Sequence, residues 1–515
     1  MKNFFISLTL ITIFFNSGFA QENIRELQIL HWNDMHSTNT PYEVKRKDRK
    51  TGEEKRYTVG GTSGVLGYIN KFRNPNTLVL NAGDDYQGSP ISTITRGFSQ
   101  VHLLNLFNLD AFTIGNHEYD YSWQSLDSAL KLANFDYLSA NIFNENLNRL
   151  EGKAWIVKEV NGIKTGIIGL NSPELLQLTL PDNMGGIRIL DSDSVISVAI
   201  KQLKAENVNL IVLLTHAGVE TDKLFAEKFY GDVDLIVGGH SHTPIFNAEN
   251  INGTYIVQAG SRGRWIGKVN LEIDIDKDTI VSFSSELVET VYDQSINDSN
   301  AENIVKKMLA DIEPQMQEVI GYLETDWKRS YTQESNLGQW QADAIRKRTG
   351  TDITFLNAGG IRKDLPAGEI KVVDIWEINP FGNNIVKFEV TGKTLKEMVE
   401  NNLNISMNEI KNAGSSDKLV VSGVEILYNP DNFEADGDLL VSLKVNGDEL
   451  SMERSYSIST NNYMAAQFRK YFGEVEQSIN IINTGLIDRD VILDAVEEQK
   501  RINSVLEERI KTVSN

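Results

Sequence analysis

Short apolar runs alternate with polar turns through the first half of this 515-residue chain. Seven of the runs predict buried strands, at residues 27–31, 77–80, 111–114, 137–140, 166–170, 210–214 and 234–237. Amphipathic stretches such as residues 122–134 and 192–206 predict helices between some of these strands. Strands that alternate with helices in this way predict an α/β fold with a largely buried sheet core.

Polar side chains that commonly bind metal ions directly follow several of the predicted strands. Five of the seven histidines fall in these motifs, which are Trp32-Asn33-Asp34-Met35-His36, Gly83-Asp84, Gly115-Asn116-His117-Glu118, Thr215-His216 and Gly239-His240-Ser241-His242. In open α/β sheets the functional site forms beyond the carboxyl ends of the strands, where such loops converge. The motifs therefore lie where a functional site is expected.

The residue types in these motifs suit two adjacent divalent metal ions. Asp34 with His36, and His240 with His242, are two residues apart, so that both members of a pair can reach one ion. The two oxygens of Asp84 could bridge the ions. Mixed imidazole and carboxylate ligands favour Zn, Mn, Fe or Co over Mg or Ca. A two-metal centre indicates hydrolysis of a phosphorus ester.

The N-terminus and the composition indicate an exported enzyme. Lys2, the apolar run 4–15 and Gly18-Phe19-Ala20 are typical of a signal peptide over residues 1–20, which predicts a periplasmic or secreted protein. Without cysteine, the chain must rely on its core and on metal for stability. A formal charge of −21 disfavours nucleic acid as a partner. No later segment is apolar enough for stable membrane insertion, and nothing implies a partner protein.

Composition also divides the chain into parts. A first domain is expected over residues 21–290, a polar linker helix over 291–321 and a second domain over 322–515. The second domain is predicted to contain a helix at 337–348, a strand at 354–356 and an amphipathic tail helix at 491–510. The charged run at 45–50 is interpreted as a solvated loop.

The order of the first-domain motifs resembles the calcineurin-like metallophosphoesterases. With the second half included, residues 26–463 resemble the bacterial 5′-nucleotidase/UDP-sugar hydrolase family. The resemblance implies an N-terminal calcineurin-like α/β sandwich and a C-terminal α+β substrate domain. It also implies a catalytic His117 held by Asp120, although a carboxylate at a helix N-terminus is the alternative for Asp120. The implied ligands are Asp34, His36, Asp84 and His242 for one metal, and Asp84, Asn116, His216 and His240 for the other.

Two segments of the second half carry the resemblance to a nucleotide-binding domain. Residues 357–362 resemble the family's Asn-x-Gly-Gly-Ile-Arg signature, and residues 380–383 resemble its Pro-Phe-Gly-Asn element, whose Phe stacks on the base. Core packing is the alternative for Phe381. The implied substrate-binding residues are Asn357, Gly359, Gly360, Arg362, Phe381, Asn383 and Tyr463.

The sequence departs from the family in two places. Residues 331–335 lack the family's further Arg before Asn336, and residues 461–468 lack its Gly-Gly-Asp-Gly element, which leaves Tyr463 as the second stacking face. We therefore expect a 5′-nucleotidase that acts on nucleoside 5′-monophosphates. A 2′,3′-cyclic nucleotide phosphodiesterase/3′-nucleotidase, a UDP-sugar hydrolase and a sulfur-ester hydrolase are alternatives on the same scaffold. A non-catalytic binding protein would have lost some of the ligands, and none is missing.

Overall fold

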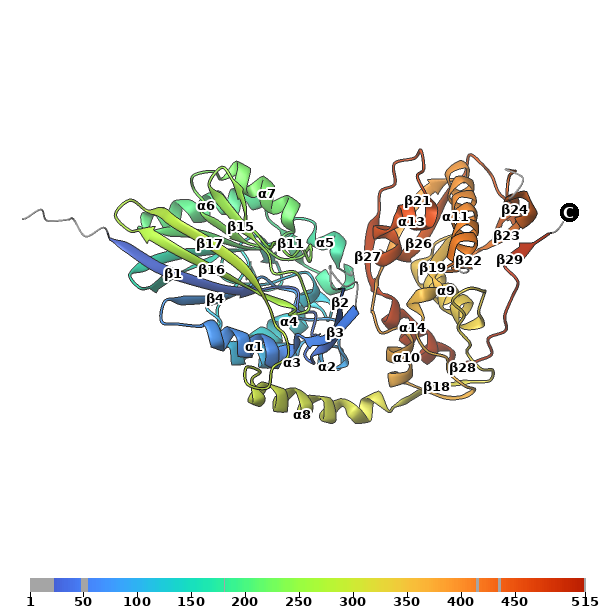
Figure 1. Ribbon diagram of the computed structural model, residues 1–515, viewed down its shortest axis with the longest axis horizontal. Coiled ribbons are helices and arrows are strands. Elements are labelled where there is room, and N and C mark those ends of the chain that lie inside the picture. Colours follow the sequence, from blue (N-terminus) through green and yellow to red (C-terminus); the bar gives the residue numbers. More distant parts are fainter. Residues whose placement is uncertain (1–22, 48–53, 180, 414–415, 434–436, 514–515) are drawn as a thin grey trace, which may run out of the picture.

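The computed structural model describes residues 23–47, 54–179, 181–413, 416–433 and 437–513. The expected signal peptide, residues 1–20, lies outside the described residues. Two lobes lie side by side, joined by the helix α8 (Ser299–Met316), which runs along the lower side of the N-terminal lobe and leads into the C-terminal lobe (Figure 1). In the described ranges, no helix is both long enough and apolar enough to cross a bilayer.

The N-terminal lobe is built on two six-stranded sheets. The first has the strand order β17 (Thr279–Glu289), β16 (Trp265–Asp274), β1 (Ile24–Trp32), β4 (Thr77–Asn81), β5 (Ala111–Thr113) and β6 (Tyr137–Leu138). The second has the order β14 (Glu249–Ile251), β15 (Thr254–Val257), β13 (Leu235–Val237), β12 (Leu210–His216), β10 (Ile163–Asn171) and β9 (Trp155–Val160). These strands include all seven that the sequence predicted.

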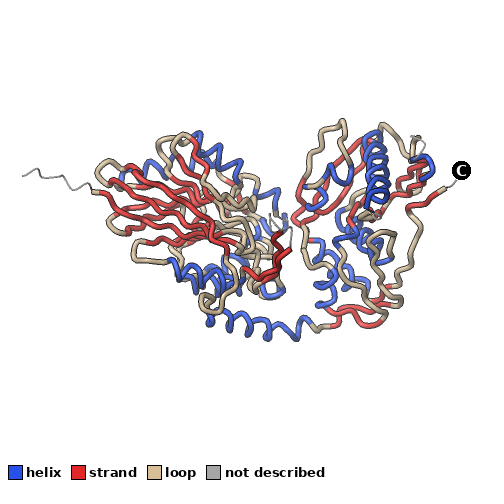
Figure 2. The backbone as a smooth tube through the Cα atoms, in the orientation of Figure 1, coloured by secondary structure: helices blue, strands red, loops and turns tan. Residues whose placement is uncertain are grey.

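Apolar side chains from both sheets form one core between them, which includes Leu80, Ile167 and Leu214. Helices cover the outer faces, as Figure 2 shows in blue against red strands. The outer face of the first sheet is covered by α1 (Gly61–Phe72), α3 (Phe98–Leu104) and α4 (Trp123–Leu130), and that of the second by α6 (Ser192–Ala205) and α7 (Val219–Lys228). The expected α/β sandwich is therefore confirmed.

The pairing of the strands brings the motif-bearing loops to one edge. β1 pairs in parallel with β4, β4 with β5, and β12 with β13, so the carboxyl ends of neighbouring strands meet. Each of the five motifs follows one of these strands or ends it. The loops that carry the candidate ligands consequently converge above the sandwich core.

The C-terminal lobe contains a five-stranded sheet with helices on both faces. Its strand order is β22 (Leu419–Ser422), β19 (Ile353–Asn357), β26 (Ser455–Asn461), β21 (Asn384–Thr391) and β27 (Ile482–Ile487). The helix α11 (Gly392–Ala413) packs on one face, where Leu395 and Met398 join the core. The helices α9 (Asn336–Thr349) and α14 (Asp488–Gln499) pack on the other through Ile345 and Val491.

Smaller sheets complete both lobes. They contain β7 (Ile142–Asn144), β8 (Arg149–Leu150) and β11 (Ile187–Ile189) in the first lobe, and β18 (Val319–Leu323), β20 (Gly368–Lys371), β23 (Val424–Tyr428), β24 (Leu440–Val445) and β25 (Asp448–Glu449) in the second. The lobes meet through an apolar cluster in which Ile91 of the first, Ile312 and Met316 of α8, and Trp376 of α10 (Val372–Ile378) pack together.

The predicted tail helix over residues 491–510 is wrong beyond residue 499. α14 ends at Gln499, and Lys500 takes a left-handed φ of 63° that turns the chain away. The next residues form β28 (Arg501–Ile502), which pairs with β18, and β29 (Ile510–Thr512), which pairs with β23. Apolar residues continue beyond the end of α14 because these two short strands bury some of them.

The prediction of a loop at residues 45–50 is wrong for the described part of this charged run. Its described residues belong to β2 (Tyr42–Lys47), which forms an antiparallel hairpin with β3 (Glu54–Val59). The side chains of Lys45 and Arg46 are exposed, as solvation of the run requires. Half-buried Val44 and Tyr57 lie opposite each other on the second face, which explains why a charged segment is extended.

Candidate metal centre

One group of candidate ligands comes from the loops after β1 and β13. The Nε2 atoms of His36 and His242 lie 2.8 Å apart, and Nε2 of His242 lies 3.2 Å from Oδ1 of Asp34. One ligand atom from each of the three residues lies within 4.8 Å of the other two. An imidazole pair that faces a carboxylate at this spacing can hold one divalent cation.

A second group lies beside the first and contains Asp84, His216 and His240. Nε2 of His216 lies 3.0 Å from Oδ2 of Asp84, and both side chains are buried. Asp84 also groups with His36 and His117 on its other side, within the same 4.8 Å. Asp84 is therefore placed between the two sets of imidazoles.

Two features of this cluster fit a metal ion better than a network of hydrogen bonds. The buried amide oxygen of Asn116 has no hydrogen-bond partner among the described residues. Nδ1 of His216 lies 2.6 Å from the carbonyl oxygen of Ala82, which it can reach only as a donor. Donation from Nδ1 leaves the lone pair of Nε2 available for an ion. The donor set of imidazole, carboxylate and amide atoms is one that divalent metals bind.

The backbone of the ligand loops is strained. Asp34, His36, Asp84, His240 and His242 have left-handed φ angles of 52°, 45°, 58°, 75° and 55°. Residues other than Gly adopt this region rarely and at a cost of about 1–3 kcal/mol each. Such strain persists only where the surrounding structure holds the chain in place, and it is typical of functional sites.

Electrostatics among the side chains of the cluster favours the metal-binding forms of some ligands but not of His216. Burial would lower the pKa of His216, but the carboxylate of Asp84 outweighs it and raises this pKa to about 10, so an ion there must displace a proton. Burial alone would raise the pKa of Asp84, but His216 and His117 outweigh it and hold this pKa well below its ordinary value. Burial and the neighbouring imidazoles lower the pKa of His36 to about 3 and that of His240 to about 4. An ionised carboxylate and neutral imidazoles are the forms that ligate metals.

His117 lies next to the cluster and has different surroundings. Its Nδ1 lies 2.8 Å from Oδ2 of Asp120, and its backbone N–H donates to Oδ1 of Asp84. Burial would lower the pKa of His117, but the carboxylates of Asp120 and Asp84 outweigh it and raise the pKa to about 9. Asp120 therefore contacts the imidazole directly instead of serving only as a helix-terminal charge.

Two residues for which no role is predicted from the sequence hold the ligand loops together. The buried carboxylate of Glu118 accepts backbone N–H groups from Asp84, Asp85, Tyr86 and Gly115 at 2.7–3.2 Å. The side-chain amide of Asn33 donates to Asp34 and to the carbonyl oxygen of Gly260, and its oxygen accepts from Ala259. Their position inside the motifs was visible in the sequence, but the direction of their hydrogen bonds was not.

A cleft of about 460 Å³ separates the cluster from the C-terminal lobe. His36, His117 and His242 line it on one side, and Phe381 and Asn383 line it on the other. The Phe381 side chain is 47% exposed, so core packing does not explain its presence. Asn383 is fixed by Asp488, which accepts its backbone and side-chain N–H groups.

The other substrate residues expected in the C-terminal lobe are not among the described residues that line this cleft. The guanidinium of Arg362 donates to the carbonyl oxygen of Gly359 and lies 5.7 Å from the centre of the Phe381 ring. Asn357 is buried and accepts from Asn461. Tyr463 is exposed beside Tyr471. Gly360 completes the short helical turn between Asn357 and Arg362.

Comparison with known proteins agrees with this architecture. Residues 27–244 match the calcineurin-like phosphoesterase family, and residues 318–474 match the 5′-nucleotidase C-terminal domain family. The chain belongs to the calcineurin-like phosphoesterases that carry a 5′-nucleotidase C-terminal domain. As a member of these families it is a metal-dependent phosphoester hydrolase.

Similar proteins include full-length and partial matches. The 5′-nucleotidase of Homo sapiens is 28% identical, and the match covers 92% of this phosphoesterase and 90% of that protein. Endonuclease YhcR of Bacillus subtilis is also 28% identical, but the match covers 86% of this chain and only 37% of that protein. Haemophilus influenzae NAD nucleotidase has the same fold, with a TM-score of 0.76, 21% identity and coverage of 96% and 100%.

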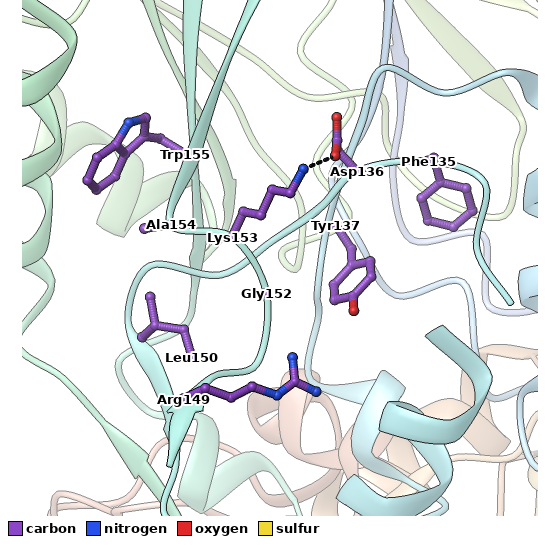
Figure 3. A pocket seen from close by; sticks show the side chains of 9 residues that line it. All are labelled: Phe135, Asp136, Tyr137, Arg149, Leu150, Gly152, Lys153, Ala154 and Trp155. Atoms are coloured by element: carbon purple, nitrogen blue, oxygen red, sulfur yellow. Dashed lines mark hydrogen bonds and ion pairs between the residues drawn. The ribbon is translucent and has the colours of Figure 1, made fainter. Parts of the chain in front are cut away.

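The phosphoesterase has a second pocket, of about 610 Å³, which carries none of the candidate ligands. Its lining includes Tyr137, Arg149 and Trp155, together with Lys153, which pairs with Asp136 (Figure 3). Arg149 pairs with Asp127. Because its cations are already neutralised and it shares no residue with the cluster, this pocket is not the phosphoesterase centre.

Substitution of Glu118 tests whether the loops depend on its carboxylate. In Glu118→Gln, an amide N–H₂ replaces one acceptor and faces backbone donors, and each buried unsatisfied group costs about 1–3 kcal/mol. We expect the variant to lower both the midpoint of thermal unfolding and the bound metal. The matched control is Glu174→Gln at an exposed helix start without a side-chain cap. Equal stability and metal content in the two variants would contradict this role.

Proposed function

We propose that the chain is a 5′-nucleotidase that hydrolyses nucleoside 5′-monophosphates to nucleoside and phosphate. The observation that carries the proposal is the cleft of about 460 Å³ with the metal-ligand histidines on one wall and the exposed Phe381 on the other. A phosphate bound at the histidines and a base stacked on an aromatic ring are the two ends of a nucleotide. The similarity to the human 5′-nucleotidase over most of both chains supports the same activity.

Two divalent ions, of Zn, Mn, Fe or Co, are proposed as the cofactors. Asp34, His36 and His242 would hold one ion, and Asn116, His216 and His240 the other, with Asp84 shared by both. The grouping of the carboxylate and imidazole ligand atoms within 4.8 Å supports this assignment, as does the buried amide oxygen of Asn116, which has no hydrogen-bond partner among the described residues. When bound, such ions lower the pKa of a water molecule and neutralise phosphoryl oxygens.

His117 and Asp120 are proposed as the catalytic pair. The carboxylate of Asp120 accepts a hydrogen bond from the protonated Nδ1 of His117, and this contact fixes the orientation of the imidazole ring. The opposite side of the imidazole is directed to the cleft that His117 lines. A positively charged His117 there stabilises charge on the phosphoryl group and donates a proton to the leaving oxygen.

The C-terminal lobe is proposed to bind the nucleoside. Phe381 stacks on the base, and Asn383 is held in place beside it by Asp488. Arg362 lies over the Phe381 ring, where it steadies the aromatic face. Asn357, Gly359 and Gly360 shape the turn below Arg362, and Tyr463 is the proposed second stacking residue.

Export is proposed to follow from the signal-peptide pattern, with Gln21 as the first residue of the mature enzyme. The proposed parts are the phosphoesterase domain at 21–290, the linker helix at 291–321 and the substrate domain at 322–515. The helix α8, at Ser299–Met316, lies within the proposed linker. N-terminal sequencing of exported protein would test the cleavage site.

A 2′,3′-cyclic nucleotide phosphodiesterase is the second candidate. In place of the family's Gly-Gly-Asp-Gly element, residues Asn462–Ala466 form a short helix, α12, and Tyr463 is absent from the described lining of the cleft. This difference changes the nucleoside side of the site and leaves the metal side intact. A panel of AMP, 2′,3′-cyclic AMP and UDP-glucose separates the candidates.

Activity and its metal dependence are the first prediction from this function. Protein loaded with Mn or Zn should release phosphate from AMP, and removal of the metal with a chelator should abolish the release, because bound ions would activate the attacking water and neutralise phosphoryl charge. Phosphate release is measured before and after metal is restored. If AMP is not hydrolysed by the loaded enzyme, the 5′-nucleotidase proposal is rejected.

The second prediction concerns the effect of removing the imidazole of His117. We expect His117→Ala to lower kcat about 10²- to 10⁴-fold, the usual contribution of general acid–base catalysis, with the metal content unchanged. Steady-state kinetics and elemental analysis measure the two quantities. His102→Ala, at an exposed position on α3, is the control and should keep the wild-type kcat. Loss of metal from His117→Ala would contradict the assigned role.

A further inference from the structure

The cleft beside the metal cluster differs in charge from the rest of the protein. The chain has 71 acidic and 50 basic residues, with a formal charge of −21. Among the described residues that line the cleft, none is Asp or Glu, and Arg262 is the one Lys or Arg. The remaining polar lining consists of His, Ser, Thr, Asn and Gln side chains. The lining of the cleft is therefore suited to an anion, and the guanidinium of Arg262 carries the formal positive charge of this lining.

Arg262 is held next to the first group of candidate ligands. Its backbone N–H donates to the carbonyl oxygen of Asp34 at 2.7 Å, and its φ is 58°, in the left-handed region. The preceding Gly260 is tied to the same loop through Asn33. The position of the Arg262 side chain on the cleft wall is thus coupled to the loop that carries Asp34 and His36.

The guanidinium of Arg262 is available for a ligand. In the ranges that the structure describes, it forms no ion pair and no side-chain hydrogen bond, and the residue is exposed. Arg264, two residues further on, is the opposite case. Its guanidinium pairs with Glu289 at 2.9 Å and stacks on Trp265 at 4.5 Å. Only Arg262 of this pair is placed to bind something outside the protein.

Among the described residues that line the cleft, none from the C-terminal lobe carries a charge. Arg362 does not belong to the described lining, and it already donates to the carbonyl oxygen of Gly359. Residues 331–335 contain no Arg or Lys. An anionic substrate in this cleft consequently meets a guanidinium from the N-terminal lobe, on the same side as the metal ligands.

We propose that Arg262 binds the phosphate group of the substrate and makes the centre selective for phosphate monoesters over diesters. A monoester carries a charge of about −1.5 to −2 at pH 7, and a diester lacks the second ionisable oxygen. The fork of N–H donors on Arg262 can bind two non-bridging oxygens of either ester, and the second negative charge of the monoester strengthens this contact. This inference deepens the proposed nucleotidase function, but it concerns the esterification of the phosphate and not the base.

The experiment compares monoester and diester hydrolysis in wild-type enzyme, Arg262→Gln and Arg262→Lys. Charged hydrogen bonds contribute about 1.5–3 kcal/mol, so we expect Arg262→Gln to lower kcat/KM for AMP about 10- to 100-fold. For 2′,3′-cyclic AMP the expected loss is less than about 3-fold, since its single charge is neutralised by the ions. Arg262→Lys should recover part of the AMP activity, because it keeps the charge without the fork.

Two controls separate this role from others. Arg264→Gln removes an equal charge two residues away, and its monoester-to-diester ratio should equal that of the wild type. Metal content is measured in every variant. Equal losses for both substrates, no loss for AMP, or loss of metal in Arg262→Gln would each overturn the proposal, the last because Arg262 would then only hold the Asp34 loop.

The test does not depend on the nucleotide assignment. If wild-type enzyme fails to hydrolyse AMP, the 5′-nucleotidase function is rejected, and p-nitrophenyl phosphate with bis-p-nitrophenyl phosphate serves as the monoester and diester pair. A selective loss of monoester hydrolysis in Arg262→Gln would support the role of Arg262 in that case too. If AMP is hydrolysed but the ratio is unchanged in the variant, only the Arg262 proposal fails.

Discussion

The position of Asp84 between two sets of imidazoles is the constraint on which the rest of the site depends. Its carboxylate groups with His216 and His240 on one side and with His36 and His117 on the other. These residues come from loops after β1, β5 and β13 and from the end of β12, which belong to two different sheets. The sandwich must therefore align both sheets before the cluster can form. A buried carboxylate in this position is stable only when cations or protonated groups surround it.

The protein holds this arrangement through backbone contacts as much as through the ligands themselves. Glu118 accepts backbone N–H groups from the loops of Asp84 and Gly115, and Asn33 links the Asp34 loop to Gly260. These contacts oppose the strain of the left-handed φ angles at the candidate ligands. The backbone N–H of Arg262 donates to Asp34 in the same loop network, so the proposed anion-binding residue is attached to the loop that carries two candidate metal ligands.

The sequence predicted the parts of the fold that follow from local patterns. Buried strands such as β1 and β12 are continuous apolar runs, and polar residues at their ends identify the cluster without any knowledge of distance. The helix prediction is wrong beyond residue 499 because Ile502, Leu506 and Ile510 recur every four residues, which is a helical spacing, yet Ile502 is buried by pairing of its strand with β18. The many charged residues of β2 favour the prediction of a solvated loop, although this strand pairs with β3 in a hairpin.

The contacts of Glu118 and the proposed role of Arg262 could not be predicted for a different reason. A carboxylate that accepts four backbone N–H groups looks the same in sequence as one exposed to solvent. Whether an arginine faces a cleft or pairs with a glutamate depends on strands that are distant in the chain, as the contrast with Arg264 and Glu289 demonstrates. Such roles arise from tertiary contacts, which single-sequence patterns do not encode.

The account rests on two ions that share the carboxylate of Asp84, and elemental analysis of protein purified without chelators tests it most directly. Wild-type protein should hold about two equivalents of divalent metal, and Asp84→Ala should hold at most about one, because both ions lose a ligand. Circular dichroism of the variant would establish that the sandwich has folded. A single equivalent in the wild-type protein, or two in folded Asp84→Ala, would contradict the shared-carboxylate centre.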